Sequence, residues 1–297
     1  MAEAGAKPVM EGPTDPVLAR FLLNSTIRQL RDEDGRGPNA LAAAANTPVS
    51  TMKRWLATGN AEWKGPQVLA LLGAFGYHRD HPKTQQLLQL TTAARKNNVV
   101  GRPEWLRSTA FDLLVALEQV SERIETFEYS VIPGLLQTPE YARAFFVHAG
   151  YSDDADLDER VQLRIDRQRL LHRETPGPVQ YLAVVDEAVL HRSPAGPDVM
   201  RRQLEHLLGL GARENITVQV IPYSAGPYRT EGNGPYVILH SERVGRQITY
   251  VETSLAATYF ETPEANRRYA DAWTRLAARA WGPEKSAEMI RDLLRTT

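Results

Sequence analysis

One short stretch of the sequence places polar and basic side chains where a helix could present them to nucleic acid. Thr47 can cap a helix whose first position is Pro48. Met52 and Trp55 are three residues apart and should face the core. The residues left facing outward at the N-terminal end of this helix are Val49, Ser50, Lys53 and Arg54. That end of a recognition helix enters the major groove of DNA, so the spacing predicts a DNA-reading face.

Three charged side chains in the C-terminal half could orient a ligand or the charged terminus of a partner. Glu187 and Arg192 follow Val179–Val185, a Val-rich run that is expected to form a strand. Glu252 ends a second expected strand, Gln247–Val251. Charged groups can fix a ligand in its site, and Glu187 or Glu252 could also act as an acid or base. The same residues could equally form structural salt bridges, and both interpretations remain open.

Motifs of catalysis and metal binding are missing from the sequence. There is no cysteine, and therefore no thiol nucleophile or Cys-ligated zinc. The patterns G-x-S-x-G, H-E-x-x-H and G-x-x-x-x-G-K-[ST] are absent as well. His78 and His81 are three residues apart, but no carboxylate cluster near them completes a metal site. We expect no catalytic residues, metal or cofactor, and favour a binding protein over an enzyme.

Length and composition limit the number of domains that hold these residues and the class of protein to which the chain belongs. The chain has 297 residues, 42% of them hydrophobic and 24% charged, which suits two domains of about 100–200 residues each. Its longest apolar run, Ala40–Ala45, is far shorter than the ~20 residues that span a bilayer. The first sixteen residues lack the apolar core of a signal peptide. We therefore expect a cytoplasmic protein without a membrane partner.

Charge is distributed unequally along the chain. Residues 1–100 contain 12 Lys+Arg and 8 Asp+Glu, a balance of +4, while the remaining residues carry −5 within a net charge of −1. An asymmetry of this sign favours an N-terminal module that meets an anionic partner such as DNA.

Four segments are expected: a disordered tail (1–16), a helical region (17–91), a linker (92–104), and a domain of helices and strands (105–297). The helical region has short apolar-periodic pieces with short links, which is typical of a compact bundle. In the last segment helices are expected at 105–124, 139–149, 157–172, 197–211, 263–281 and 283–294. An extended piece is expected at 127–132 and strands at 179–185, 216–221, 236–240 and 247–251. This pattern predicts a mostly helical α+β protein with a small sheet.

The stretch LAAAANTPVSTMKRW (41–55) has the features of a helix-turn-helix. Ala42 supplies a small residue where the helices cross, and Asn46 tolerates the left-handed turn. The stretch resembles the xenobiotic-response-element (Cro/repressor-like) regulators, whose DNA-binding domain has five short helices. The resemblance implies that Val49, Ser50 and Lys53 face base edges. It also implies phosphate contacts from Arg28, Arg31 and Arg54.

The chain departs from that family at the start of both helices of the motif. Members commonly have polar pairs there, whereas this sequence has Gly37-Pro38 and Pro48-Val49. These residues remove side-chain hydrogen bonds to DNA, so few base contacts would remain.

The run EYSVIPGLLQTPEYARAFF (128–146) resembles the hallmark of a C-terminal domain of unknown function. Many actinobacterial antitoxin-like regulators carry this domain after a Cro/repressor-type helix-turn-helix. RQRLLHR (167–173), VVDEAVLHR (184–192) and ITVQVIPYSAG (216–226) continue the resemblance in the same order. It implies a dimeric transcription regulator whose C-terminal domain senses a small molecule or binds a small partner protein encoded nearby.

An alternative function follows from the departures in the helix-turn-helix. With Pro38, Pro48 and Val49 at normally polar positions, the chain could be a regulator scaffold whose DNA contacts have decayed. It would then serve as a metabolite-binding protein or enzyme in specialised metabolism.

Overall fold

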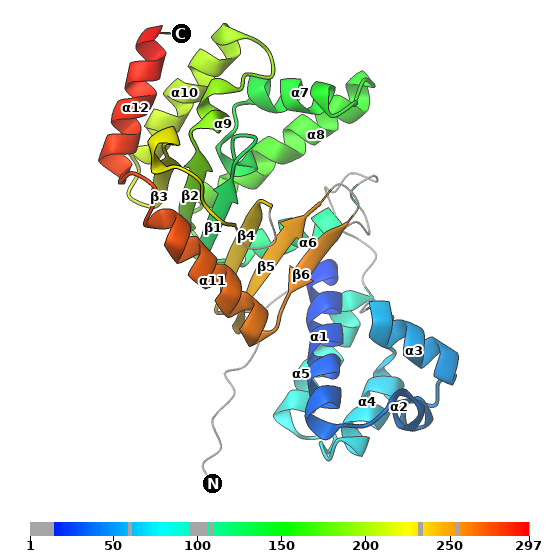
Figure 1. Cartoon of the computed structure of the whole chain (residues 1–297). Helices are drawn as coiled ribbons and strands as arrows, with labels where there is room; N and C mark the ends of the chain where they lie inside the picture. Colours follow the sequence, from blue (N-terminus) through cyan, green and yellow to red (C-terminus); the bar gives the residue numbers. More distant parts are fainter. Residues whose placement is uncertain are drawn as a thin grey trace. The chain divides into compact units, whose positions relative to one another are not determined.

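The computed structural model describes residues 15–58, 61–95, 106, 110–230, 234–253 and 256–296. The chain forms two compact units, Met1–Leu117 with Arg243–Gly245, and Glu118–Glu242 with Arg246–Thr297. A helical N-terminal region precedes a region of helices and a six-stranded mixed sheet, which confirms the expected α+β class (Figure 1). No helix within these ranges is long and apolar enough to cross a lipid bilayer.

Five helices in the described part of the chain precede residue 96, and local sequence signals set their ends. They are α1 (Pro16–Asp34), α2 (Pro38–Ala44), α3 (Val49–Thr58), α4 (Gly65–Ala74) and α5 (Pro82–Ala94). Proline occupies the first or second position of α1, α2, α4 and α5, where its missing N–H costs no hydrogen bond. Helix α5 continues to Ala94, so residues 92–94 of the expected linker are helical. Residues 96–104 lie outside the described ranges.

The core of these helices forms around α1, which packs against α5. Buried apolar residues recur on α1 at helical spacing: Leu18, Leu22, Leu23, Ile27 and Leu30. Asn24 lies among them and is also buried. Its Oδ1 accepts hydrogen bonds from the Ala61 N–H (3.1 Å) and the Trp63 indole N–H (3.0 Å), and its Nδ2 donates to the Ala61 carbonyl (3.0 Å). One amide therefore fixes the segment before α4 onto α1.

The rest of the chain alternates helices and strands. Its elements are α6 (Ala110–Gln119), β1 (Arg123–Glu128), η2 (Gly134–Leu136), α7 (Pro139–His148), α8 (Asp154–Arg167), η3 (Gln168–Leu171), β2 (Gln180–Asp186), α9 (Ala188–His191), α10 (Pro197–Gly211), β3 (Ile216–Ile221), η4 (Tyr223–Ala225), β4 (Tyr236–Ser241), β5 (Arg246–Glu252), β6 (Ala257–Phe260), α11 (Pro263–Ala277) and α12 (Pro283–Thr296). The strand order in the sheet is β3-β2-β1-β4-β5-β6. Strands β1, β2 and β3 run parallel, and β4, β5 and β6 add antiparallel pairs.

Two expectations about the second unit are wrong. The long helix expected at 105–124 ends at Gln119, and Arg123 and Ile124 instead begin β1. Ile124 is buried and lies between Tyr181 of β2 and Leu239 of β4, so pairing on both sides outweighs helix propensity. Strand β6 exists but is not among the expected strands. It has only four residues and pairs only with β5 at the edge of the sheet, so its local sequence signal is weak.

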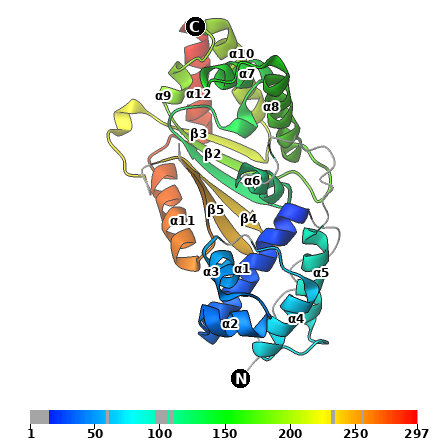
Figure 2. The same ribbon diagram turned by 90° about the vertical axis from the view of Figure 1, so that its right-hand side faces the viewer.

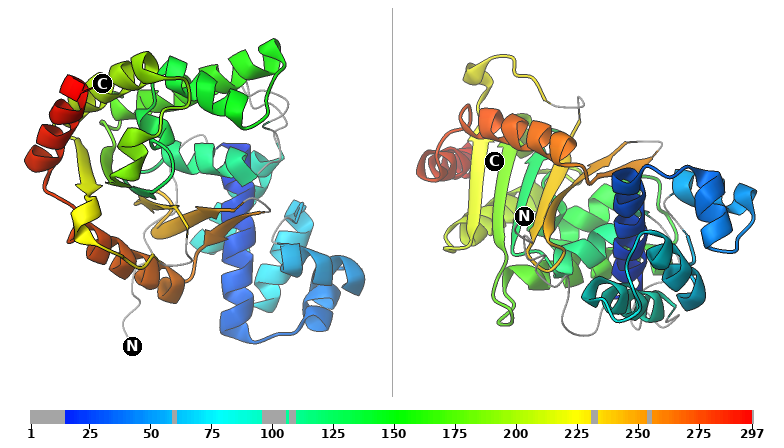
Figure 3. Two further views of the ribbon diagram at one scale, coloured as in Figure 1. Left: turned by 45° about the horizontal axis from the view of Figure 1, so that its top comes forward. Right: turned by 90° about the horizontal axis from the view of Figure 1, so that it is seen from below.

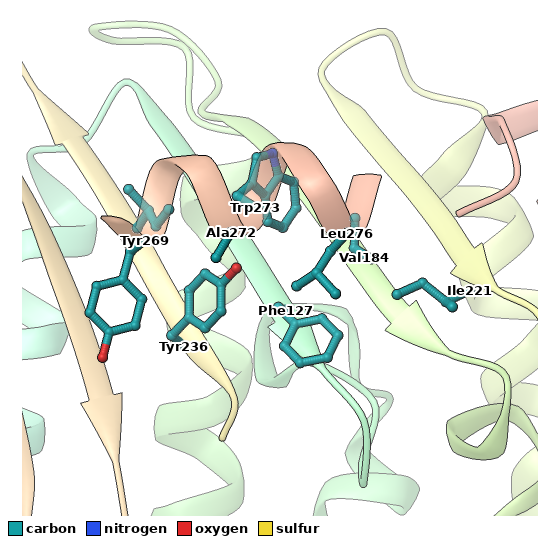
Figure 4. Packing of buried hydrophobic residues seen from close by; sticks show 9 residues of the cluster. Phe127, Val184, Ile221, Tyr236, Tyr269, Ala272, Trp273 and Leu276 are labelled. Carbon is teal, nitrogen blue, oxygen red and sulfur yellow. The ribbon is translucent and has the colours of Figure 1, made fainter. Parts of the chain in front are cut away.

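The two faces of the sheet are chemically different. Helix α11 crosses one face, with α8 and α10 on the other (Figure 3). The cluster under α11 is apolar and aromatic (Figure 4) and contains Phe127, Val184, Ile221, Tyr236, Ile238, Tyr269, Ala272, Trp273 and Leu276. Successive strand residues point to opposite faces, so Phe127 under α11 places Glu128 on the face of α8. The second face therefore carries charge where the first carries an aromatic core.

Candidate functional site

The turn between α2 and α3 has the backbone that a closely packed helix pair requires. Asn46 has a φ of 46°, the one positive φ outside glycine among the described residues. The Asn46 N–H donates to the Ala43 carbonyl and the Thr47 N–H to the Ala42 carbonyl, the two bonds of a Schellman ending. Ala42 is buried, and α2 and α3 lie side by side (Figures 1 and 2). The left-handed turn expected at Asn46 is thus confirmed.

Helix α3 divides into a buried and an exposed face. Met52 is fully buried, and the half-buried Trp55 packs edge-on against Trp63 with ring centroids 4.7 Å apart. All four residues of the predicted DNA-reading face are exposed: Val49, Ser50, Lys53 and Arg54. The helix therefore presents a hydroxyl and two cations together at its N-terminal end.

Helix α3 begins at Val49, and the Met52 N–H donates to the Pro48 carbonyl (3.0 Å), so Pro48, the expected first helical residue, immediately precedes the helix and Thr47 lies one residue further out. The Thr47 hydroxyl donates to the Ala45 carbonyl (3.1 Å) and accepts from Nε2 of Gln67 (2.9 Å). The other amide atom of Gln67, Oε1, accepts from the Lys64 N–H at the start of α4. Gln67 thereby connects the α2–α3 turn to α4 and holds the base of α3 in place.

Arg28 and Arg31 lie on the second half of α1, on a different element from the other predicted DNA contacts. Both are half-buried. The Arg31 guanidinium binds Asp32, with Nε and Nη2 at 2.8 and 2.5 Å from Oδ1. A phosphate contact by Arg31 would therefore compete with this ion pair.

Glu187 holds the segment that follows β3. Its Oε2 accepts a hydrogen bond from the Tyr223 N–H (2.6 Å), and its Oε1 lies 3.5 Å from Nε2 of His191. The His191 ring stacks on Tyr223 with centroids 5.9 Å apart. These contacts support the structural interpretation of Glu187.

Arg192 reaches from the end of α9 to the segment after β1. Its Nη1 donates to the Tyr129 carbonyl at 3.4 Å, and both residues are exposed. Tyr129 and Tyr223 are two of the large apolar side chains exposed in the described chain. The structure thus brings Glu187 and Arg192 to the carboxyl ends of three parallel strands, a common place for ligands in α/β sheets.

Glu252 lies at the same end of the sheet, at the carboxyl end of β5, but its neighbours are different from those of Glu187 and Arg192. Strands β1 and β5 flank β4, with Phe127 opposite Tyr236 and Val237 opposite Tyr250. This register puts Glu128 and Glu252 roughly 10 Å apart in backbone terms, two strand spacings across. We call Glu128, Arg164, Tyr250 and Glu252 the edge cluster.

Charges in the edge cluster act on one another at a distance. Burial, and then the Glu252 carboxylate, raise the pKa of Glu128 to about 8, against the opposing effect of Arg164. Burial and the nearby Arg167 lower the pKa of Arg164 to about 9. Tyr250 donates a hydrogen bond to Oε2 of Glu252 (2.9 Å), and burial with this carboxylate raises the Tyr250 pKa.

Arg164 also packs against the glycine of the Pro-Gly-Leu-Leu segment. A Cβ added to Gly134 would lie 2.7 Å from Nη1 of Arg164, so the guanidinium packs directly on the glycine backbone. Nη1 donates to Oε1 of Gln137 (2.9 Å), while the Phe146 ring centroid lies 4.9 Å from Cζ. Gln168, one turn along the same helical stretch, donates to the Gln137 carbonyl (2.7 Å).

A buried ion pair lies next to the edge cluster. Nε and Nη2 of Arg167 donate to the two carboxylate oxygens of Glu118, at 2.8 and 2.7 Å. Both side chains are almost fully buried, at 7% and 2% exposed. Two parallel hydrogen bonds make this the strongest geometry for an arginine and a carboxylate.

Sequence reasoning identifies Glu252 but misses Glu128, Arg164 and Tyr250. Glu128 opens the run EYSVIPGLLQT, and its place beside strand residues is the available signal. Arg164 gives none, because it lies in an arginine-rich helix and 30 residues separate it from Gly134. No group of three His, Asp or Glu side chains suited to a metal ion occurs among the described residues.

Comparison with known proteins identifies one region. A family model described as a domain of unknown function (DUF5753) matches residues 111–292, more than half of the chain. No curated protein matches the chain. No solved structure matches it either.

Proposed function

Because the chain belongs to the DUF5753 family, whose domain has no assigned function, we propose its function from its own surfaces: a DNA-binding transcription regulator. In this proposal helix α3 reads DNA, and the DUF5753 domain senses a small molecule or binds a small partner protein. The N-terminal region adds the helix-turn-helix, and the family match begins after it, at residue 111.

The observation that carries the proposal is the α2–turn–α3 unit with its exposed face. A Schellman ending at Asn46 lets α3 start immediately after α2. The face of α3 then offers Ser50 and Lys53 to base edges and Arg54 to phosphate, with Val49 available for a thymine methyl group. Helix-turn-helix proteins insert this end of the second helix into the major groove.

A dimer is part of the same proposal. Ser50 and Lys53 offer few base contacts, and a good bidentate contact supplies only about 1–3 kcal/mol of discrimination. Two copies on half-sites one helical turn apart would double the contacts. The N-cap of α2, Gly37, makes no side-chain hydrogen bond, so α2 does not compensate with a polar side chain at that position.

The test begins with selection of binding sites from random duplex DNA by the full-length protein. Affinity for the selected site is then measured by gel shift at one fixed salt concentration. The double variant Lys53→Ala, Arg54→Ala should lose about tenfold or more in affinity, since two cations leave the interface. Its circular dichroism and melting temperature should match the wild type, because both side chains are exposed.

The matched control is Arg79→Ala, Lys83→Ala, which removes the same charge from the turn before α5 and its first helical turn. The control should keep the affinity of the wild type. Equal affinity of both double variants, or no selected site at all, would contradict the proposed DNA-reading face.

The alternative function, a metabolite-binding scaffold or enzyme with decayed DNA contacts, draws support from the buried carboxyl of Glu128 in the edge cluster. It predicts no DNA affinity even at low salt. It also predicts a bound metabolite in native mass spectra of the purified protein. Co-purification of a small protein would instead indicate a partner-binding role for the DUF5753 domain.

A further inference from the structure

Glu128 carries a buried carboxyl oxygen without a hydrogen-bond partner among the described residues. The atom is Oε2, at the last residue of β1. Buried polar atoms in native proteins are nearly always satisfied, because leaving one unpaired costs about 1–3 kcal/mol. An oxygen without a partner at the carboxyl end of a central strand therefore needs an explanation. A ligand that donates a hydrogen bond to it is one explanation.

Arg164, another member of the edge cluster, also has N–H donors that are available to a ligand. Of the five N–H donors of a guanidinium, one bonds to Gln137 within the described part of the chain. Gly134 and Phe146 pack against the guanidinium and hold it in place. Arg164 influences Glu128 and Glu252 electrostatically, yet no ion pair within 4.0 Å joins it to either among the described residues.

From these contacts we propose that the edge cluster binds a small ligand carrying a primary ammonium group next to an oxygen. Glu128 and Glu252 would accept hydrogen bonds from the ammonium, and Arg164 would donate to the oxygen. The inference names a ligand class for the proposed sensing role of this domain and rests on it, but binding of the ligand does not require DNA.

The charge balance of the cluster favours an organic cation. When the ligand is bound and Glu128 is ionised, the carboxylates of Glu128 and Glu252 leave one negative charge beyond that of Arg164, since Glu118 and Arg167 neutralise each other. A primary ammonium has three N–H donors, enough for Glu128 and Glu252 together. A metal ion suits the cluster poorly, because no group of three His, Asp or Glu side chains placed to hold one occurs in the described part of the chain.

Ligand binding should displace a proton from Glu128. Its pKa of about 8 keeps the carboxyl protonated at neutral pH in the free protein. The groups that interact with it electrostatically are Arg164 from α8, Glu252 from β5, Tyr141 from α7 and Tyr181 from β2. Tyr250, also from β5, donates its hydrogen bond to Glu252. An ammonium placed on Glu128 stabilises the carboxylate and lowers this pKa. Affinity should consequently rise about tenfold per pH unit between pH 6 and 8.

The experiment follows the Glu128 carboxyl carbon by NMR in full-length protein labelled with ¹³C-glutamate. The variant Glu128→Gln assigns the signal, and it should fold normally because glutamine resembles the protonated carboxyl. Ethanolamine is the probe, since its amine stays protonated across pH 6–8 and its hydroxyl supplies the oxygen. Saturating ethanolamine should lower the Glu128 pKa by about two units, from about 8 to about 6, which corresponds to the expected rise in affinity between pH 6 and 8.

Two controls separate recognition from nonspecific charge effects. Choline has the same charge and hydroxyl group but no N–H donor, and it should leave the Glu128 pKa unchanged. Glu140→Gln, an exposed glutamate of α7, should bind ethanolamine as the wild type does, while Glu128→Gln should bind at least tenfold more weakly. Equal pKa values in ethanolamine and choline, or equal binding by Glu128→Gln and wild type, would overturn the proposal. No DNA is present, so failure of the DNA-binding proposal would leave this result intact.

Discussion

Helix α3 and the region around α8 hold their charges in opposite ways. Lys53 and Arg54 are exposed side chains on α3. Arg164 and Arg167 of α8 are instead held by glycine, aromatic rings and carboxylates inside the second unit. Exposed charges can be removed at little cost to the fold, whereas buried ones are part of it. The same residue type, arginine, is therefore exposed on α3, where we propose that it contacts DNA, and packed into the second unit on α8.

The two faces of the sheet extend this contrast within one unit. Phe127 lies in the aromatic core under α11, and the next residue, Glu128, points to the polar face. A single strand thus separates an apolar core from a charged cluster. Because burial of unpaired charge is costly, the polar face is where a functional requirement can outweigh stability.

The largest effect is expected from breaking the buried ion pair. Arg167→Met leaves the carboxylate of Glu118 buried without its two hydrogen bonds. We expect the free energy of unfolding, measured by urea denaturation at pH 7, to fall by about 3–5 kcal/mol. If the decrease proved negligible, the distinction between architectural and exposed arginines would fail.

Two companion variants sharpen this result. Arg169→Ala removes an arginine that is 80% exposed and pairs with Asp166, so it should cost no more than about 0.5 kcal/mol. Replacing both buried partners, Arg167→Met with Glu118→Leu, should recover much of the stability because no lone charge remains.

The second effect concerns how stability changes with pH. The folded-state pKa of Glu128, about 8, lies above the ordinary value of ~4.3 for an unfolded chain. As pH rises between these values, the unfolded state releases a proton that the folded state keeps, so stability falls by about 1.4 kcal/mol per unit. Glu128→Gln removes this decrease and should gain on the wild type by up to about 4 kcal/mol from pH 5 to 8.

Urea denaturation at several pH values measures this difference. Glu140→Gln, from the exposed surface of α7, should give a profile parallel to the wild type. A parallel profile for Glu128→Gln would mean that Glu128 ionises like an exposed carboxyl. The charges of the edge cluster would then behave like the exposed charges of α3.

A smaller effect is expected from the polar group inside the first unit. Asn24→Ala leaves the Ala61 N–H and the indole N–H of Trp63 without their acceptor in a buried place. We expect the free energy of unfolding to fall by about 2–3 kcal/mol in urea denaturation. The control, Gln29→Ala on the exposed side of the same helix, should cost less than about 0.5 kcal/mol. Equal effects of the two variants would show that α1 is not anchored through Asn24.

Local signals in the sequence are sufficient for most helices and for the α2–α3 turn. Helix α10 has its expected bounds, because Pro197 opens it and an apolar stripe follows. Asn46 in the turn and Met52 in the core also follow from short-range rules. The DNA-contacting roles of the four exposed α3 residues remain predictions.

Long-range pairing decides what local sequence cannot show. The start of β1 has helix-compatible residues, and only β2 and β4, more than 50 residues away, make it a strand. The contact of Gly134 with Arg164 and the pair of Glu118 with Arg167 cross 30 and 49 residues. Nothing in local periodicity distinguishes these arginines from their exposed neighbours on α8.

The smallest effect on stability is expected where the effect on DNA should be clearest. Lys53→Ala, Arg54→Ala removes two exposed side chains of α3 and should leave the free energy of unfolding within about 0.5 kcal/mol of the wild type. DNA binding should respond differently, because each cation at a phosphate releases counterions from the duplex. The slope of log affinity against log salt concentration should become shallower by up to about 1.8, or about 0.9 for each phosphate that is no longer neutralised. Fluorescence anisotropy with the selected duplex at several salt concentrations measures this slope. An unchanged slope with reduced affinity would assign Lys53 and Arg54 to base edges instead of phosphates. Reduced stability of this variant would show that charges on α3 support the fold, as those on α8 do.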